Sequence, residues 1–290
     1  MPTSLAYPAV VFIWSTTALA ISWSVGGMSF MSALVGRMAL GTLFAVLALF
    51  LLGRSFPMGR AAWRNYLIAG GAMVSSMLCT YWAAQSVSSG LIAVLYGLSP
   101  LVTALLASLI VGERPGRGEL VGIGLALLGL WLIFSGRLSI GHGGVLAILA
   151  VLAGVVLQAL GAVLTKKYGS EVPPMATAAG ALLVSAVGSG LVWLLFDRQL
   201  PQAVSARGIW AVVYLASVGS VLAMSLYFLL IQRLPTSHVA LITLITPVTA
   251  LWLGHVLNGE SVEPHVWQGS LVILAGLAVH QLPLWLKRRR

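Results

Sequence analysis

The sequence predicts an all-α polytopic membrane protein in which ten transmembrane helices form two five-helix inverted repeats. Hydrophobic residues make up 59% of the 290 residues and charged residues only 8%, whereas a soluble domain carries about 25% charged residues. The second half of the chain also repeats the first after a shift of 147 residues. Because each half contains an odd number of predicted spans, the two copies must enter the bilayer in opposite orientations.

Ten apolar stretches are long enough to cross about 30 Å of hydrocarbon as helices. No Lys or Arg precedes the first stretch, so it lacks the basic region of a signal peptide and we expect it to remain as a span. Short connections containing Gly, Pro, Ser or Arg make consecutive helices antiparallel neighbours. The stretches run over residues 5–23, 30–52, 65–84, 91–111, 118–136, 143–165, 174–196, 209–230, 237–257 and 266–286.

The repeat holds without a gap from residue 63 to residue 276. We expect residues 1–138 to form the first repeat and residues 139–290 the second, within one membrane bundle. Inverted repeats of this kind are typical of secondary transporters, whose substrate site lies near the middle of the membrane between the copies. The matched pairs are Trp63 and Trp210, Met77 and Met224, Gln85 and Gln232, Pro100 and Pro247, Gly112-Glu113 and Gly259-Glu260, Gly122 and Gly269, and Gly129 and Gly276.

The distribution of Lys and Arg predicts that both termini face the cytoplasm. In that orientation 12 of the 16 basic residues lie in cytoplasmic segments, three lie in external loops, and Arg37 lies within a span. This excess follows the positive-inside rule. The predicted cytoplasmic loop at Glu113 carries Arg114 and Arg117, whereas its external equivalent at Glu260 has no Lys or Arg. The net charge of +10 therefore indicates contact with anionic lipid rather than with nucleic acid.

The chain resembles the EamA family of the drug/metabolite transporter superfamily. The resemblance rests on the ten-helix repeat, on the paired segments Leu98–Glu113 and Ile245–Glu260, and on the glycine spacing that follows them. It covers nearly the whole chain and implies a bacterial inner-membrane exporter of amino acids, other metabolites or drugs. One position departs from the family pattern, because Gln158 stands where such proteins often carry Trp, while the matching position of the first half keeps Trp14.

The first candidate site residues lie on the two spans that contain a central proline. Pro100 and Pro247 each remove an amide donor and free the carbonyl four residues earlier. Irregular backbone in mid-membrane is tolerated where it lines a cavity or is covered by protein. We therefore expect a helix kink and a substrate contact in each span, although the prolines could merely bend two packed helices. The substrate-binding candidates are Tyr96, Ser99, Thr243 and Thr246.

Four other spans carry the remaining substrate-binding candidates. A flexible Met and an amphipathic Tyr at helical spacing suit an adaptable, mostly apolar pocket. A Trp in mid-membrane is also unusual, because Trp normally lies at the membrane interfaces. Ordinary helix packing is the alternative explanation for both patterns. The candidates are Ser76, Thr80, Met224 and Tyr227 on the third and eighth spans, and Trp14 and Gln158 on the first and sixth.

Few charged or titratable groups lie within the predicted spans. Arg37 is a candidate for coupling or gating, with outward snorkelling or bonding to freed carbonyls as the alternatives. His255 is a second candidate, with a satisfied polar contact as the alternative. All six acidic residues fall in loops or at helix ends, which favours facilitated flow over proton coupling. We expect Glu113 and Glu260 to cap helices, each stabilising the positive end of the helix that follows.

These features predict an exporter of small metabolites, amino acids in particular. An uncharged amphipathic lining suits zwitterions with apolar or aromatic side chains. A multidrug or organic-cation exporter is the alternative, and a buried carboxylate would favour it. An intramembrane enzyme would need a nucleophile–base pair or clustered ligands, and a channel would need polar rings on several helices. We therefore expect no catalytic residue, metal or cofactor, and only substrate and lipid as partners. Both a monomer and a homodimer remain open.

Overall fold

The computed structural model describes residues 3–26, 28–112, 116–135, 142–168, 172–198, 204–234, 236–260 and 263–286. Within these ranges the chain consists of helices and short connections, and contains no β-strand. The prediction of an all-α protein is therefore confirmed for the described part of the chain.

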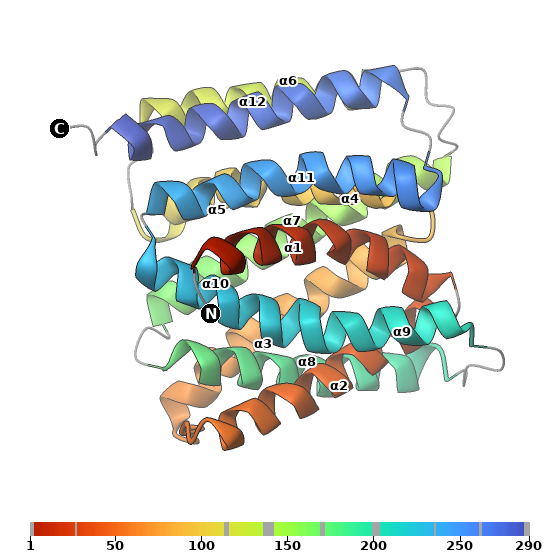
Figure 1. The fold of residues 1–290 in the computed structure, drawn as a ribbon, viewed down its shortest axis with the longest axis vertical. Coiled ribbons are helices and arrows are strands. Elements are labelled where there is room, and N and C mark those ends of the chain that lie inside the picture. The colour runs from red at the N-terminus through yellow and green to blue at the C-terminus, as the bar shows by residue number, and fades with distance from the viewer. Residues whose placement is uncertain are drawn as a thin grey trace.

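The helices follow one another in two similar series. The first half contains α1 (Thr3–Val25), α2 (Phe30–Leu51), α3 (Arg60–Ala83), α4 (Ser89–Tyr96), α5 (Ser99–Ile110) and α6 (Arg117–Ser135). The second half contains α7 (His142–Tyr168), α8 (Pro174–Phe196), α9 (Ala206–Tyr214), the π-helical segment η1 (Leu215–Leu222), α10 (Ala223–Arg233), α11 (Thr236–Asn258) and α12 (Pro264–Leu286). The start of α1 and the end of α12 lie toward the same side of the bundle, on the left in Figure 1, which we call the terminal face.

Local sequence explains where several helices begin and end. Ser29, Ser88 and Ser205 precede α2, α4 and α9, and each hydroxyl accepts a hydrogen bond from the backbone amide three residues later. Gly112 and Gly259 have positive φ angles of 79° and 63°, which glycine adopts at little steric cost. The glycines of the repeated Gly-Glu pairs therefore end α5 and α11 in the same way.

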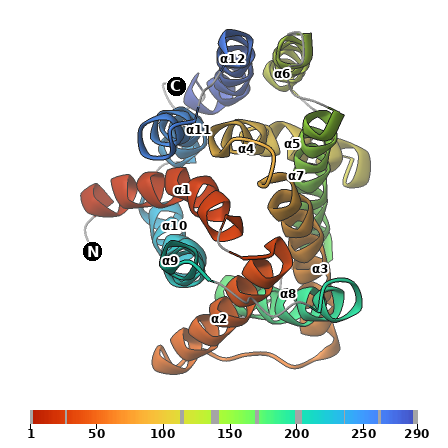
Figure 2. The same ribbon diagram turned by 90° about the vertical axis from the view of Figure 1, so that its right-hand side faces the viewer.

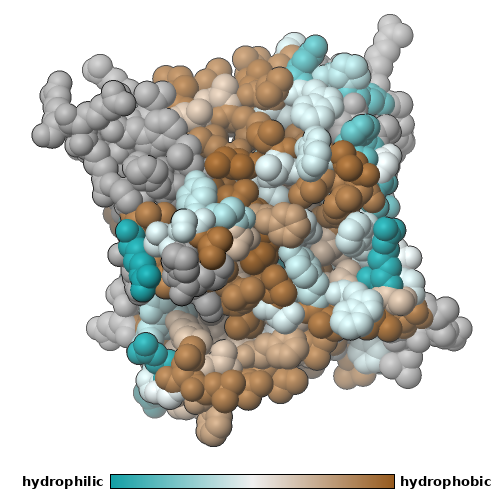
Figure 3. All heavy atoms as spheres, viewed as in Figure 1, coloured by the Kyte–Doolittle hydropathy of each residue, from teal (hydrophilic) through white to brown (hydrophobic). Residues whose placement is uncertain are grey.

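Five helical segments are long and apolar enough to cross a membrane among the residues that the structure describes. They are α1, α2, α4 with α5, most of α7, and α8. Large hydrophobic side chains cover the outside of the bundle, for example Phe50, Leu109 and Trp131, which are 81%, 73% and 63% exposed. Hydrophilic side chains lie mainly toward the two ends of the helices in the face drawn in Figure 3. Such a surface suits lipid rather than water, and the count of ten spans remains a prediction.

The antiparallel pair α6 and α12 shows the repeat in three dimensions. A methyl group added to Gly129 would lie 2.6 Å from the carbonyl oxygen of Gly269, and one added to Gly276 would lie 2.7 Å from that of Gly122. Only glycine allows two helix backbones to approach this closely. The shift of 147 residues converts one of these contacts into the other, as expected when two copies are related by an inverted arrangement.

Helices of the two halves interleave around a common centre (Figure 2). α3 packs against α7 and α8, α1 packs against α9, α10 and α11, and α2 packs against α8 and η1. α6 and α12 lie together at one end of the bundle. The middle of the bundle is consequently lined by both halves, so a central site would draw its residues from both.

Candidate functional site

Three hydroxyl groups from α3 and α4 form one hydrogen-bonded group, which we call the hydroxyl cluster. The Tyr96 hydroxyl lies 2.9 Å from Ser76 Oγ and 2.6 Å from Thr80 Oγ1. Thr80 also donates to the Ser76 carbonyl oxygen at 2.9 Å. Ser76 and Thr80 are fully buried, and their spacing of four residues places both on one face of α3. The structure thus brings together three of the predicted substrate-binding residues.

A glycine and a glutamine on α7 complete this region. A methyl group added to Gly154 would lie 3.0 Å from the Ser76 carbonyl oxygen and 3.3 Å from Thr80 Oγ1, so the glycine lets α7 approach the cluster. Gln158 follows one turn later, and its Oε1 lies 3.5 Å from Ser76 Oγ, which is a long hydrogen bond. Its side chain is exposed. Gly154 was not among the predicted residues, although its spacing of four residues from Gln158 was a usable signal.

Two predicted aromatic residues from α1 and α10 form a second group. The rings of Trp14 and Tyr227 have centroids 4.9 Å apart and are tilted by 44°. Both pack against a small apolar core of their own, which is separate from the main core. Its buried members include Val10, Ile13 and Leu230. Tyr227 is the repeat equivalent of Thr80, so the same position carries an aromatic ring in one half and a cluster hydroxyl in the other.

The hydroxyl residues near the prolines differ in their hydrogen-bond partners. Thr246 donates to the Ile242 carbonyl of its own helix at 2.7 Å, and the Thr246 carbonyl accepts from Ser15 of α1 at 3.4 Å. Thr243 is half-buried on the same helix. In contrast, Ser99 has a buried Oγ with no hydrogen-bond partner among the described residues.

The backbone conformation around Pro100 differs from that around Pro247. The chain leaves the helix at Gly97 and Leu98, immediately before Ser99 and Pro100 open α5. α11 instead continues through Pro247 as an unbroken helix. A methyl group added to Gly97 would lie 3.2 Å from Pro247 Cγ, so the break in one repeat packs on the proline of the other.

Met224 lies in another part of the bundle. It lines a mostly apolar recess between α2, α8 and the junction of η1 with α10. The other lining residues are Ala45, Met175, Ala178, Leu182, Ser220 and Val221. No member of the hydroxyl cluster lines this recess, so Met224 is not brought together with the other candidates there.

Arg37 is buried on α2, with only 6% of its surface exposed. Its Nη1 lies 3.4 Å from the Tyr81 hydroxyl and 3.8 Å from the sulfur of Met77, both on α3. Tyr81 was not among the predicted residues, although it follows Thr80 directly. The arginine therefore lies against the helix that carries two members of the hydroxyl cluster.

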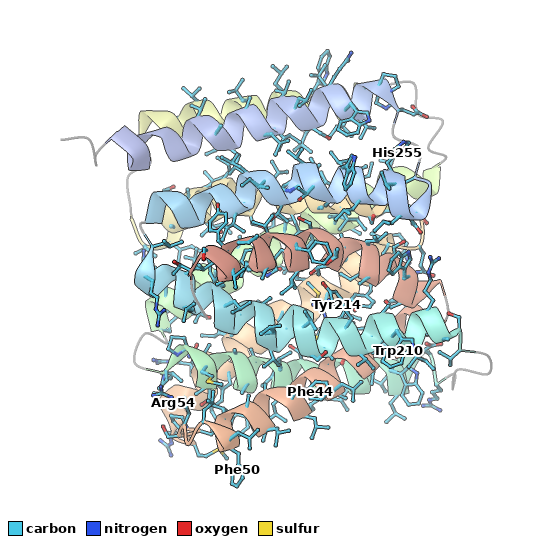
Figure 4. All side chains as sticks on the ribbon, in the orientation of Figure 1. Phe44, Phe50, Arg54, Trp210, Tyr214 and His255 are labelled. Carbon is cyan, nitrogen blue, oxygen red and sulfur yellow. The ribbon has the colours of Figure 1, made fainter. Side chains whose placement is uncertain are left out.

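His255 lies near the end of α11, on the side opposite the terminal face (Figure 4), and Glu260 follows two residues after this helix ends. The carboxylate of Glu260 accepts hydrogen bonds from the backbone amides of Ser89 and Gly90 at 3.1 and 3.3 Å, and from Asn258 Nδ2 at 2.9 Å. It therefore caps α4 of the other repeat, and not the helix that follows it in the chain. His255 is exposed, with Nδ1 3.0 Å from the Glu260 carbonyl oxygen. Glu113 lies outside the described residues.

Comparison with known proteins gives the family. The sequence profile of the EamA-like transporter family matches residues 4–135 and again residues 145–280. The chain belongs to the EamA-like transporter family. The resemblance predicted from the paired proline and Gly-Glu segments is thereby confirmed, and the protein is a membrane transporter built from two EamA repeats.

Individual EamA relatives support the same class. The chain is 30% identical to the uncharacterized inner membrane transporter YedA of Escherichia coli K12, over 99% of this chain and 92% of that protein. It is 25% identical to the uncharacterized transporter YwfM of Bacillus subtilis 168, over 95% and 92% of the two chains. A probable amino-acid metabolite efflux pump of Salmonella typhimurium LT2 is 27% identical over 66% of this chain and 67% of its own.

A solved crystal structure shares the fold. It superposes with a TM-score of 0.67 at 22% sequence identity, and the match covers 99% of this chain and 98% of the other. At this identity the likeness shows the arrangement of helices alone. The helices of this protein are thus arranged as in that structure, and the roles of individual residues rest on the geometry given above.

Proposed function

We propose that this EamA transporter exports small amphipathic metabolites, amino acids in particular, by alternating access around a central site. The observation that carries the proposal is the pair of contrasting groups at equivalent positions of the two repeats. One repeat contributes the hydroxyl cluster of Ser76, Thr80 and Tyr96. The other contributes Tyr227, whose ring packs at a tilt against that of Trp14. Hydroxyls can bind the polar end of a zwitterion, while aromatic rings accept its apolar side chain.

Four further residues complete the proposed lining, namely Gln158, Ser99, Thr243 and Thr246. Met224 is a contact in the recess between α2, α8 and the junction of η1 with α10. The exposed amide of Gln158 beside Ser76 gives the hydroxyl cluster an accessible polar edge. The buried, unpartnered hydroxyl of Ser99 is a further group that a polar substrate could satisfy. The Salmonella relative described as a probable amino-acid metabolite efflux pump supports the same substrate class.

The proposed topology has ten spans and both termini in the cytoplasm of a bacterial cell. The terminal face is then the cytoplasmic face. The excess of Lys and Arg in the corresponding segments supports this orientation, and the YedA relative is described as an inner membrane transporter. Residues 1–138 and 139–290 are the two repeat units of the proposal.

Transport in this proposal is facilitative. The acidic side chains that the structure describes are Asp197, Glu260 and Glu263, and each is engaged near a helix end. Asp197 accepts from Ser29, Glu260 caps α4, and Glu263 lies 3.3 Å from the ring of His265. A carboxylate in this state is poorly placed to carry protons through the middle of the membrane.

Counterflow in proteoliposomes tests the proposed function. Vesicles preloaded with one unlabelled amino acid should accumulate the same labelled amino acid transiently, with leucine, phenylalanine and tryptophan among the strongest responses. Glutamate and lysine should respond weakly because the proposed lining is uncharged. Flux should not require a proton gradient. Transport of hydrophobic organic cations with no response to any amino acid would contradict the proposal and favour a cation exporter.

A further inference from the structure

Arg37 carries a permanent charge in a place where charge is unfavourable. Its side chain is 94% buried, since only 6% of its surface is exposed. Arginine does not lose its proton in proteins, and a buried guanidinium is costly unless it is paired and hydrogen-bonded. An intramembrane arginine therefore requires either an acidic partner or a function.

The protein supplies only weak, neutral partners for this charge. Nη1 lies 3.4 Å from the Tyr81 hydroxyl and 3.8 Å from the Met77 sulfur, and the Tyr81 ring centroid lies 6.0 Å from Cζ. Nε is buried without an acceptor, and Nη2 forms no hydrogen bond with any described residue. The edge formed by Nε and Nη2 is therefore unused. That edge offers two parallel N–H donors, the geometry that binds both oxygens of one carboxylate.

No described acidic residue is available to fill this position. Asp197 bonds Ser29, Glu260 caps α4, and Glu263 lies beside His265. Nor does the guanidinium reach a freed backbone carbonyl within the described part of the chain, which was one role considered for it. With 6% exposure it does not snorkel into water.

The guanidinium of Arg37 lies against the same helix, α3, that carries two members of the hydroxyl cluster. Met77 and Tyr81, which hold Nη1, directly follow Ser76 and Thr80 on α3. A ligand bound to the cluster would therefore lie along the helix that Arg37 contacts, and Arg37 is the only unpaired intramembrane charge that the described residues present.

We infer that Arg37 is the carboxylate anchor of the substrate site. Nε and Nη2 bind the two carboxylate oxygens, while Tyr81 and Met77 fix the guanidinium from its other side. The inference rests on the proposed function and narrows it, because it assigns the substrate class to amphipathic monocarboxylates, including amino acids, and disfavours amines that lack the carboxylate. It also gives Tyr81 a role as a positioning residue.

Two replacements test the proposed role of Arg37. The carboxylate of the transported amino acid is replaced by an amide, and Arg37 is replaced by Gln. Initial rates are measured in proteoliposomes for L-leucine and L-leucinamide, and for L-phenylalanine and its amide, with wild type and Arg37→Gln. In wild type we expect each acid to be transported about 10- to 100-fold more efficiently than its amide, the usual effect of a charged hydrogen bond. Arg37→Gln should remove this preference by raising KM for the acids, with amide flux maintained.

Two further variants separate anchoring from folding. Arg37→Lys keeps the charge but loses the two parallel donors, so it should recover only part of the preference for the acid. Arg64→Gln removes an arginine whose hydrogen bond is to the Tyr168 carbonyl, on the exposed surface, and should leave the preference unchanged. A folded Arg37→Gln variant that retains the wild-type ratio of acid to amide overturns the inference, as does an equal loss for both probes.

A binding measurement distinguishes failure of the anchor from failure of the proposed export of amino acids. The detergent-solubilised protein is heated with 4-methylpentanoate, which has a carboxylate and no amine, and with 4-methylpentanamide. Stabilisation of wild type by the acid alone, abolished in Arg37→Gln, supports the anchor even if no amino acid is exported. Amino acid counterflow without such stabilisation, and without an effect of Arg37→Gln on KM, retains the proposed function and rejects the anchor.

Discussion

The two repeats place different chemistry at equivalent positions of α3 and of the segment from α9 to α10. Ser76 and Thr80 of the first repeat match Ala223 and Tyr227 of the second. The first pair is hydrogen-bonded to the Tyr96 hydroxyl, whereas the ring of Tyr227 packs at a tilt against that of Trp14. The two repeats thus carry a polar side chain and an aromatic side chain at matched positions. Such asymmetry can orient an amphipathic substrate, which two identical walls could not do.

The backbones of the two repeats have diverged as well. α3 is a regular helix from Arg60 to Ala83, while the equivalent segment contains the π-helical turns of Leu215–Leu222. π-Helical segments are rare and are frequently found at functional sites. Conversely, the first repeat breaks between α4 and α5, where the second keeps α11 continuous. Each repeat therefore has one irregular helix, but not the same one.

The largest expected effect is a difference in reporter activity between the ends of the two repeats, which follows from their inverted orientation. Topology reporters fused after Ser135 and after Arg290 should give opposite results, with external activity for the first and cytoplasmic activity for the second. The reason is that the two repeats contain an odd number of spans each, so that their ends lie on opposite sides. Equal reporter activity at both positions would remove the basis of the comparison.

A bulky substitution at the proposed site should reduce transport whichever repeat carries it. Tyr96→Trp enlarges a side chain that is already hydrogen-bonded to α3, and Thr243→Trp enlarges its repeat equivalent. We expect each variant to lose about 5- to 150-fold in counterflow activity, because overpacking costs about 1–3 kcal/mol. Trp210→Phe, on an exposed position of α9, serves as a control. Normal activity in both Trp variants at normal expression would place the site elsewhere.

Milder substitutions should separate the polar and aromatic groups. Tyr96→Phe leaves Ser76 and Thr80 without their shared partner, and we expect kcat/KM to fall about tenfold for every amino acid. Tyr227→Leu removes an aromatic contact of about 0.5–1.5 kcal/mol, so we expect a roughly two- to tenfold loss confined to aromatic substrates. Concentration-dependent initial rates measure both. Identical substrate profiles for the two variants would show that the two groups do not have separate roles.

The smallest expected effect is a loss of stability when the contact between Glu260 and α4 is weakened. This contact joins the two repeats on the side opposite the terminal face. Glu260→Gln weakens the cap on α4, and we expect the variant to lose about 1 kcal/mol of stability with little change in turnover. Thermal unfolding of the purified protein and counterflow measure the two quantities. Glu263→Gln, at a residue whose carboxylate instead lies beside His265, is the matched control. Loss of proton-driven accumulation in a stable Glu260→Gln variant would instead make the carboxylate part of the coupling mechanism, and His255 would then require the same test.

Local and periodic features were predictable from the sequence. The apolar stretches, the repeat and the family motif gave the helical class and the family. Gly112 and Gly259, matched at a fixed offset, both prove to have positive φ. Three hydroxyl residues proposed from helical spacing, Ser76, Thr80 and Tyr96, do meet. Their part in substrate binding remains a prediction, as does that of the other candidates.

Contacts between distant segments were not predictable, because helical periodicity defines a face without naming the helix packed against it. Sequence alone placed Glu260 near a helix end, but only tertiary packing brought the amides of Ser89 and Gly90 to its carboxylate. The sequence likewise identified Arg37 as an intramembrane charge, whereas the packing of α2 on α3 determined that Nη1 faces Tyr81 and that Nε has no partner. The one-dimensional pattern thus determined the helical elements and their repeat. The close approach of helices from both repeats determined which side chains meet.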